Sequence, residues 1–166
     1  MARIEPPASL GADRSLGDHI DWSLHRPNMA VGMGALSDAV YTNTQLSLRE
    51  REAARFTIAL INDCAVCRDT RARDAELGHV TEGYYLEVTN WRTSEALTDR
   101  ERLAAEFAQT FALDHLRMDD AWWARVRAVF GDDEIADLTM CCATFLGLGR
   151  AMAVMGVVAP EERILL

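Results

Sequence analysis

The stretch SLREREAARFTIALINDCAVC, residues 47–67, joins the start of a helix to a pair of cysteines. Ser47 and Glu50 have the S-x-x-E spacing of a capping box, in which each side chain satisfies a free backbone N–H of the other residue. The residues that follow run without a helix breaker up to an Asn-Asp pair. The stretch therefore predicts a helix over residues 48–61.

A second, cysteine-bearing helix is expected directly after the first. Asn62 and Asp63 are residue types that cap helix starts, and Gly78 is free to take the left-handed conformation that ends many helices. These residues predict a helix that carries both cysteines and ends near residue 78. A short helical segment, residues 81–88, is expected after it.

The rest of the chain also carries helical signals. Pro27 suits the first turn of a helix, and Thr98 and Glu101 form a second capping box. The segment DDAWWARVRAVFG, residues 119–131, starts at an Asp and stops at Gly131, as a further helix would. The longest and most apolar helix is expected over residues 132–157. We find no run of alternating β-branched residues between turn signals. The sequence therefore predicts an all-α helical bundle, with an N-terminal arm at 1–26 and one helical domain at 27–166.

Charge and composition exclude several kinds of partner. The 166 residues carry a formal net charge of -9, so nucleic acid and anionic lipid are not expected as main partners. The N-terminus lacks the apolar core of a secretory signal, which favours a reducing, cytoplasmic location. The apolar segment 138–158 contains Arg150 and three glycines, so we expect a buried helix rather than a membrane span.

An internal comparison singles out one carboxylate. A shift of 51 positions aligns SLREREAARF, residues 47–56, with TDRERLAAEF, residues 98–107. The hydroxyl and the glutamate of each segment are explained by capping, and the alanines and the phenylalanine by packing. Glu52 stands where the second segment has Leu103. A chance likeness of two amphipathic helices remains an alternative to a shared template.

The pair Cys64 and Cys67 suits thiolate chemistry if it lies at a helix start. Free N–H groups and the helix dipole favour an anion there, and thiol pKa values in C-x-x-C motifs fall from about 8.5 to between roughly 3.5 and 7.5. In a continuous helix Arg71 would lie one turn beyond Cys67 and add a positive charge near its sulfur.

Other interpretations of the cysteines stay open. Two small core residues would give the same pattern, since free cysteine is often buried. A structural metal site needs four ligands, and the sequence offers no second C-x-x-C or H-x3-H. Cys141 and Cys142 are adjacent within an apolar run, so we expect them to be core residues.

The arrangement resembles the carboxymuconolactone decarboxylase superfamily, and within it the AhpD-like alkylhydroperoxidases. Their signature is a glutamate, eleven residues, C-x-x-C, three residues and a histidine, and Glu52, Cys64 and Cys67 match it at that spacing. The resemblance covers about residues 27–158 and implies the AhpD-like fold, whose members form trimers or hexamers. Arg71 stands where the signature has histidine.

The resemblance implies a role for each matching residue. Cys67 would attack the peroxide, Cys64 would resolve the sulfenic acid as a disulfide, and Glu52 would act as general base. Arg71 cannot accept a proton at working pH but could stabilise the thiolate and the departing alkoxide. The reaction needs no bound cofactor or metal. An external dithiol, lipoyl or thioredoxin-like, would reduce the disulfide.

The sequence therefore predicts a thiol-dependent peroxidase or disulfide oxidoreductase that acts on small alkyl hydroperoxides. A non-redox lyase that acts on a small carboxylated ring is the alternative, motivated by the missing histidine. A non-catalytic redox sensor is a further alternative. The apolar helix from Met29 to Val40 and the Trp122–Trp123 pair would need burial against a second subunit if they are exposed in a monomer.

Overall fold

The computed structural model describes residues 3–10 and 17–166, and within these residues the chain is helical. Of the predicted arm, residues 1–2 and 11–16 lie outside the described residues. In the described ranges no strand forms, and one isolated β-bridge joins Arg71 to Leu165. The all-α prediction is confirmed. The elements are α1 Asp18–Asp21, η2 Trp22–His25, α2 Pro27–Thr42, α3 Leu48–Ile61, α4 Ala65–Asp69, α5 Glu82–Thr89, α6 Asp99–Leu113, η3 His115–Arg117, α7 Asp120–Arg127 and α8 Asp132–Val154.

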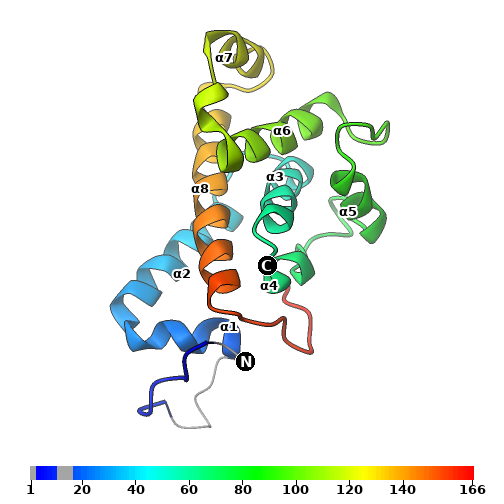
Figure 1. Ribbon diagram of the computed structural model, residues 1–166. Coiled ribbons are helices and arrows are strands. Elements are labelled where there is room, and N and C mark those ends of the chain that lie inside the picture. The colour runs from blue at the N-terminus through cyan, green and yellow to red at the C-terminus, as the bar shows by residue number, and fades with distance from the viewer. Residues whose placement is uncertain (1–2, 11–16) are drawn as a thin grey trace.

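Helices α3 and α6 pack against each other at the centre of the bundle, and α8 runs alongside both (Figure 1). Alanines line the contact between α3 and α6 and are fully buried, which lets the two backbones approach closely. Both predicted capping boxes are present, at Ser47 and Glu50 and at Thr98 and Glu101. Local capping and small residues thus set the position of the central helix pair.

The two helices of the internal comparison exchange ion pairs. Arg49 Nε of α3 lies 2.5 Å from Glu101 Oε1 of α6, and Arg100 of α6 pairs with Glu50 of α3. Arg49 aligns with Arg100, and Glu50 with Glu101, in the sequence comparison. Each arginine therefore binds the capping-box glutamate of the other helix, which supports one template for both segments.

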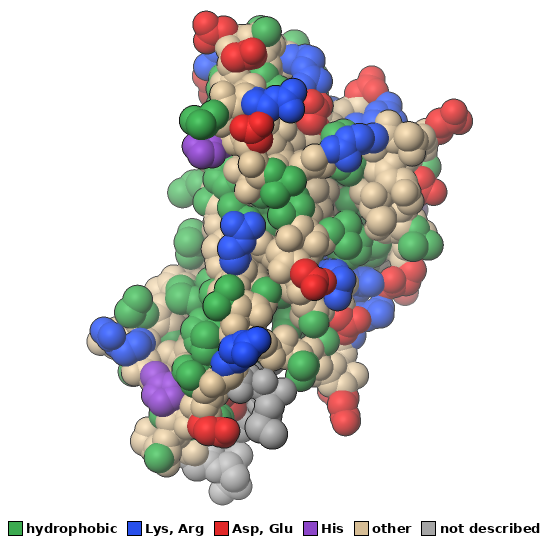
Figure 2. All heavy atoms as spheres, in the orientation of Figure 1, with side chains coloured by type: hydrophobic (Ala, Val, Ile, Leu, Met, Phe, Trp, Pro, Cys, Tyr) green, Lys and Arg blue, Asp and Glu red, His purple; other side chains and the backbone are tan. Residues whose placement is uncertain are grey.

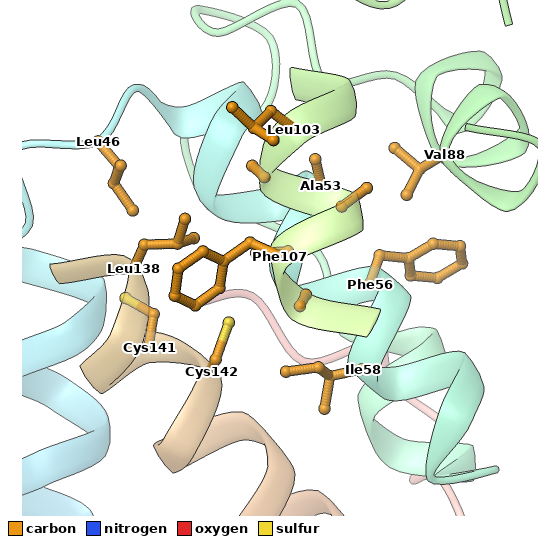
Figure 3. Packing of buried hydrophobic residues seen from close by; sticks show 14 of the residues in the cluster. Leu46, Ala53, Phe56, Ile58, Val88, Leu103, Phe107, Leu138, Cys141 and Cys142 are labelled. Atoms are coloured by element: carbon orange, nitrogen blue, oxygen red, sulfur yellow. The ribbon is translucent and has the colours of Figure 1, made fainter. Parts of the chain in front are cut away.

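The long helix α8 contributes to the core, as predicted. Figure 3 shows Leu138 and Cys142 of α8 pointing toward Phe107 of α6. Burial raises the pKa of Cys141 to about 12 and also raises that of Cys142, so both thiols stay protonated near neutral pH. By length and composition alone α8 could cross a membrane, but a core helix gives the same pattern.

The two apolar features that were expected to need a second subunit differ in exposure. Trp122 is buried and Trp123 half-buried, and both rings pack against Phe107. Helix α2, by contrast, leaves large apolar side chains exposed at Met29, Val31 and Leu36. Figure 2 shows hydrophobic side chains gathered over α2 and α8 on the side that it draws.

The cysteine-bearing helix is much shorter than predicted. It spans Ala65–Asp69 only, and Thr70 after it has extended backbone. Arg71 then forms backbone hydrogen bonds with the C-terminal segment, from its N–H to Ile164 O at 2.9 Å and from Leu166 N–H to its own carbonyl at 3.0 Å. These long-range bonds replace the bonds that would continue the helix. The expectation that Arg71 shares a helix face with Cys67 is therefore wrong.

The predicted role of Gly78 is also corrected. The left-handed backbone in this region is at His79, with φ of 53°, rather than at the glycine. A side chain at Gly78 would place its Cβ 2.4 Å from Leu48 Cδ2, at the start of α3. The glycine lies where the loop passes close to the Leu48 side chain of α3, and it does not end a helix in a left-handed conformation.

Candidate active site

The two cysteines of the C-x-x-C motif form a disulfide at the start of α4. Their Cα atoms are 5.2 Å apart, within the range that a disulfide spans. Cys64 is 1% exposed and packs against Val66 and Val157, whereas Cys67 is half-buried. Cys67 is therefore the sulfur that a small molecule reaches first.

Cys64 itself caps the short helix. Its Sγ accepts a hydrogen bond from the N–H of Cys67 across 3.1 Å, while Asp63 takes a positive φ of 49°. The prediction that Asn62 or Asp63 caps this helix is thus wrong. Asn62 ends α3 instead, and its side chain donates to the Phe145 and Leu146 carbonyls of α8.

Glu52 is fully buried in α3, at 0% exposure. Its Oε2 accepts hydrogen bonds from Arg55 Nε and from the Tyr85 hydroxyl, both at 2.8 Å, and its Oε1 lies 3.7 Å from Arg51 Nε. A buried charge is costly unless it is paired in this way. Among the described residues no hydrogen bond joins Glu52 to either sulfur.

Arg55 connects the carboxylate to the dithiol helix and is the residue that sequence reasoning missed. It is 2% exposed, and it donates from Nη1 to Cys67 O at 2.6 Å and from Nη2 to Thr70 O at 3.1 Å. Burial alone would lower the pKa of Arg55, but Glu52 and two tyrosines outweigh burial and raise it. The signal in the sequence was an arginine three residues after Glu52, which suits an ion pair within one helix.

Among the described residues, the Arg71 side chain makes no hydrogen bond to Glu52, Arg55 or either cysteine. Its Nε and Nη2 bind the two carboxylate oxygens of Glu82 at 2.7 and 2.8 Å, and its guanidinium lies 4.3 Å from the Tyr85 ring centroid. The hydrogen bond to Glu82 raises the pKa of Arg71, and the same contact lowers that of Glu82. Arg163 of the C-terminal segment also binds Glu82, at 2.7 Å. Arg71 thus fastens the C-terminal segment near the site.

A cavity of about 300 Å³ opens beside Cys67. Arg55 and Tyr41 line it together with Cys67, while most of the remaining wall is apolar and comes from α2, α8, η2 and the C-terminal segment. The backbone of Gly149 in α8 lies against the dithiol, because a Cβ there would be 3.2 Å from Cys67 Sγ. The cavity suits a small, largely apolar molecule whose polar end meets the sulfur.

The histidines with described side chains lie away from this cavity. His25, His79 and His115 are exposed, and none of them lines its wall. The side chain of His19 lies outside the described residues. Within the described part of the chain, no group of three or more His, Cys, Asp or Glu side chains could hold a metal ion.

Similar structures come from proteins described as AhpD or as peroxidase-related. A protein of unknown function from Agrobacterium tumefaciens, described as a candidate antioxidant defence protein AhpD, has a TM-score of 0.73 at 22% identity and covers 87% of this chain and 99% of its own. A peroxidase-related protein from Ralstonia eutropha JMP134, described as an alkylhydroperoxidase AhpD core, has a TM-score of 0.78 at 19% identity, with 96% and 93% coverage. A peroxidase-related protein from Silicibacter sp. TM1040 has a TM-score of 0.73 at 19% identity and covers 83% of this chain and 73% of its own.

The comparisons with sequences give a family but no individual relative. No curated protein matches the chain. The profile of the carboxymuconolactone decarboxylase family matches residues 27–110, which include α2 to α5, both cysteines of the disulfide and Glu52. The chain therefore belongs to the carboxymuconolactone decarboxylase family and has the AhpD-like fold.

Proposed function

We propose that this chain is a thiol-dependent peroxidase that reduces alkyl hydroperoxides through Cys67 and Cys64. One observation carries the proposal: the two cysteines are close enough to form a disulfide, and the more accessible one lines an apolar cavity. Cys67 attacks the peroxide, and Cys64 closes the disulfide before the sulfur reaches an irreversible oxidation state. The family and the fold support a peroxidase-related role in general.

In this proposal Glu52 is the general base and takes the thiol proton of Cys67 through a water, because among the described residues no hydrogen bond joins its carboxylate to either sulfur. Arg55 is its positioning residue. Arg55 Nε donates to Glu52 Oε2 and so fixes the position of the carboxylate, and Arg55 Nη1 in turn donates to the carbonyl of Cys67. Arg71 contributes through the C-terminal segment rather than at the sulfur. An external dithiol, lipoyl or thioredoxin-like, reduces the disulfide in the cytoplasm, and no bound cofactor is required.

The test is turnover of cumene hydroperoxide by the purified protein with dihydrolipoamide as reductant. We expect steady consumption of peroxide, and an intramolecular Cys64–Cys67 disulfide when the reductant is withheld. Cys67→Ser should abolish turnover, and Cys64→Ser should allow one oxidation and then stop. Cys141→Ala, a change to a buried thiol outside the site, is the matched control. Unchanged turnover in Cys67→Ser would falsify the proposal.

A non-redox lyase remains a second candidate, because the described histidines lie away from the cavity and cannot relay protons there. Such an enzyme would use Arg55 to bind the carboxylate of a small ring, and its sulfurs would be incidental. Turnover of a carboxylated lactone that survives Cys67→Ser, together with a dithiol inert to peroxide, would favour the lyase.

We also propose that the chain forms a homo-oligomer through the apolar faces of α2 and α8. These faces expose Met29, Val31 and Leu36 of α2, and Met140 and Val154 of α8. Large apolar side chains gathered on one surface favour burial against a second copy. Light scattering on the purified protein should give a trimer or a hexamer, and Met29→Glu should shift the population toward the monomer.

A further inference from the structure

Peroxide cleavage by a thiolate needs a proton donor as well as a nucleophile. When the O–O bond breaks, the leaving oxygen becomes an alkoxide, which is a strong base and leaves faster if a nearby acid protonates it. Arg55 lines the cavity but does not release a proton at working pH. Glu52 is not part of the cavity wall. The donor must therefore be sought among the other groups that line the cavity.

Four hydroxyl groups line the cavity, and two of them are already engaged. Ser23 donates to Ile20 O at 2.6 Å, and Thr70 donates to Val66 O at 2.9 Å. Among the described residues, the hydroxyls of Ser37 and Tyr41 have no protein acceptor. A phenol, with an ordinary pKa of about 10, is a far stronger acid than an aliphatic alcohol. Tyr41 is therefore the better donor.

The ring of Tyr41 is held in place at the cavity wall. Its centroid lies 5.5 Å from the ring centroid of Phe145 in α8 and 5.0 Å from the guanidinium carbon of Arg51. Arg51 Nη1 also donates to the Tyr41 carbonyl at 2.6 Å. Because these contacts fix the ring and the backbone, the hydroxyl needs little reorganisation to meet a bound peroxide.

The phenol is in the protonated form that a donor needs. Burial raises the pKa of Tyr41 to about 12, while Arg55 lowers it and Glu52 raises it. Arg55 and Glu52 form an ion pair, and Arg55 also binds the Cys67 carbonyl, so the charges that act on the Tyr41 hydroxyl are those next to the cysteine. A phenol of this acidity is still much more acidic than an alcohol, so proton transfer to an alkoxide is favourable.

We propose that Tyr41 is the general acid that protonates the leaving oxygen of the hydroperoxide. The proposal rests on the peroxidase function proposed above. Cys67 thiolate attacks the terminal peroxide oxygen, so that an S–O bond forms and the O–O bond breaks. Sulfur is oxidised to the sulfenic acid, and the peroxide is reduced. The alkoxide takes the phenolic proton of Tyr41 and leaves as an alcohol, and solvent reprotonates the phenolate.

The experiment compares two oxidants whose leaving groups differ in basicity. tert-Butyl hydroperoxide releases an alkoxide, whereas peracetic acid releases acetate, a weak base that gains little from a general acid. The rate constant for oxidation of the pre-reduced protein is measured in a single turnover for wild type, Tyr41→Phe and Tyr84→Phe. Tyr84 is the matched control, since its hydroxyl donates to Arg49 O and lies outside the cavity.

We expect Tyr41→Phe to slow oxidation by tert-butyl hydroperoxide about 100-fold, and oxidation by peracetic acid by less than about threefold. Tyr84→Phe should match wild type with both oxidants. Tyr41→Phe should keep its fold and its rate of Cys67 alkylation by iodoacetamide, because the lost hydroxyl has no protein partner.

Equal slowing with both oxidants, or no slowing with either, would overturn the role of Tyr41 and leave the peroxidase proposal standing. A parallel loss in the alkylation rate would also overturn it, because the change would then act on the thiolate. A wild-type protein that reacts with neither oxidant would contradict the peroxidase function itself, and the role of Tyr41 with it.

Discussion

Arg55 Nη1 donates a hydrogen bond to the carbonyl oxygen of Cys67 across 2.6 Å. This bond joins the interior of α3 to the last turn of the short helix that bears the disulfide. The same guanidinium neutralises Glu52, so one buried side chain holds both the carboxylate and the backbone of the reactive cysteine. The geometry of the site therefore depends on Arg55, a residue that the family signature does not name.

Replacing Arg55 by methionine should destabilise the protein strongly. The change leaves Glu52 as a buried charge without its main partner, which typically costs about 3–5 kcal/mol. Urea denaturation measures the free energy of unfolding. Arg125→Met is the matched control: Arg125 is 54% exposed and pairs with Glu106 at the surface, so its loss should cost less than about 1 kcal/mol. Equal effects of the two variants would contradict the importance of the buried pair.

Two glycines in α8 should respond oppositely to alanine. A Cβ at Gly149 would lie 2.8 Å from Asn62 Nδ2 and 3.2 Å from Cys67 Sγ, so Gly149→Ala should lower stability by about 1–3 kcal/mol and alter the rate of disulfide reduction. Gly147 has nothing within 4 Å of such a Cβ, so Gly147→Ala should stabilise the helix by about 0.5–1 kcal/mol. Thermal unfolding and dithiothreitol reduction kinetics check both. The close packing at Gly149 is refuted if the two variants behave alike.

Arg71→His should not create the histidine relay of the AhpD-like signature. The backbone at residue 71 belongs to the bridge with the C-terminal segment, and the side chain is directed to Glu82. We expect turnover of organic hydroperoxide to stay equal or to fall, since the variant also loses the contact with Glu82. A tenfold gain in turnover would mean that residue 71 reaches the sulfur after all.

The ion pair between Glu50 and Arg100 predicts a pH-dependent stability. Burial alone would raise the pKa of Glu50, but hydrogen bonds from Arg100 and Ser47 outweigh burial and lower it below its ordinary value of 4.5. Because the folded-state pKa is lower than the ordinary one, the carboxylate stabilises the protein fully above the ordinary pKa of 4.5, and this contribution is lost as the pH falls through the lowered folded-state pKa. Glu50→Gln keeps the capping box, so it isolates the charge.

The measurement is the free energy of unfolding of wild type and Glu50→Gln in urea, at about pH 7 and at about pH 3. Wild type should be the more stable of the two at the higher pH. The difference should shrink at the lower pH, which lies below the ordinary glutamate pKa of 4.5 and therefore closer to the lowered folded-state pKa. A difference that is the same at both pH values would show that the charge of Glu50 contributes nothing.

Features determined by neighbouring residues could be predicted from the sequence. The capping boxes at Ser47 and Thr98 involve residues three positions apart, and both were predicted correctly. The end of the cysteine helix was not, because it is set by backbone bonds from Arg71 to Ile164 and Leu166, far along the chain. No local pattern reports such a contact.

Part of the candidate site could also be predicted from the sequence, namely the residues that a motif or an internal comparison marks. Cys64 and Cys67 stand out by spacing, and Glu52 by comparison with Leu103 of the related helix. Tyr41 carries no such mark, and the spacing of Arg55 from Glu52 indicates an ion pair within one helix but not the hydrogen bond to Cys67. Their roles depend on which elements pack around the disulfide, and Tyr41 reaches the cavity from α2, a helix that the motif does not include.

The exchanged ion pairs relate α3 and α6 by an approximate twofold symmetry, so the two helices form the two halves of one frame. Within that frame the two helices differ at one aligned position: α6 has a hydrophobe, Leu103, where α3 has the buried Glu52. The same frame therefore accommodates either a hydrophobe or a buried, paired carboxylate at this position. A protein with Leu at position 52 and Glu at position 103 would show whether the frame accepts the buried carboxylate in either helix.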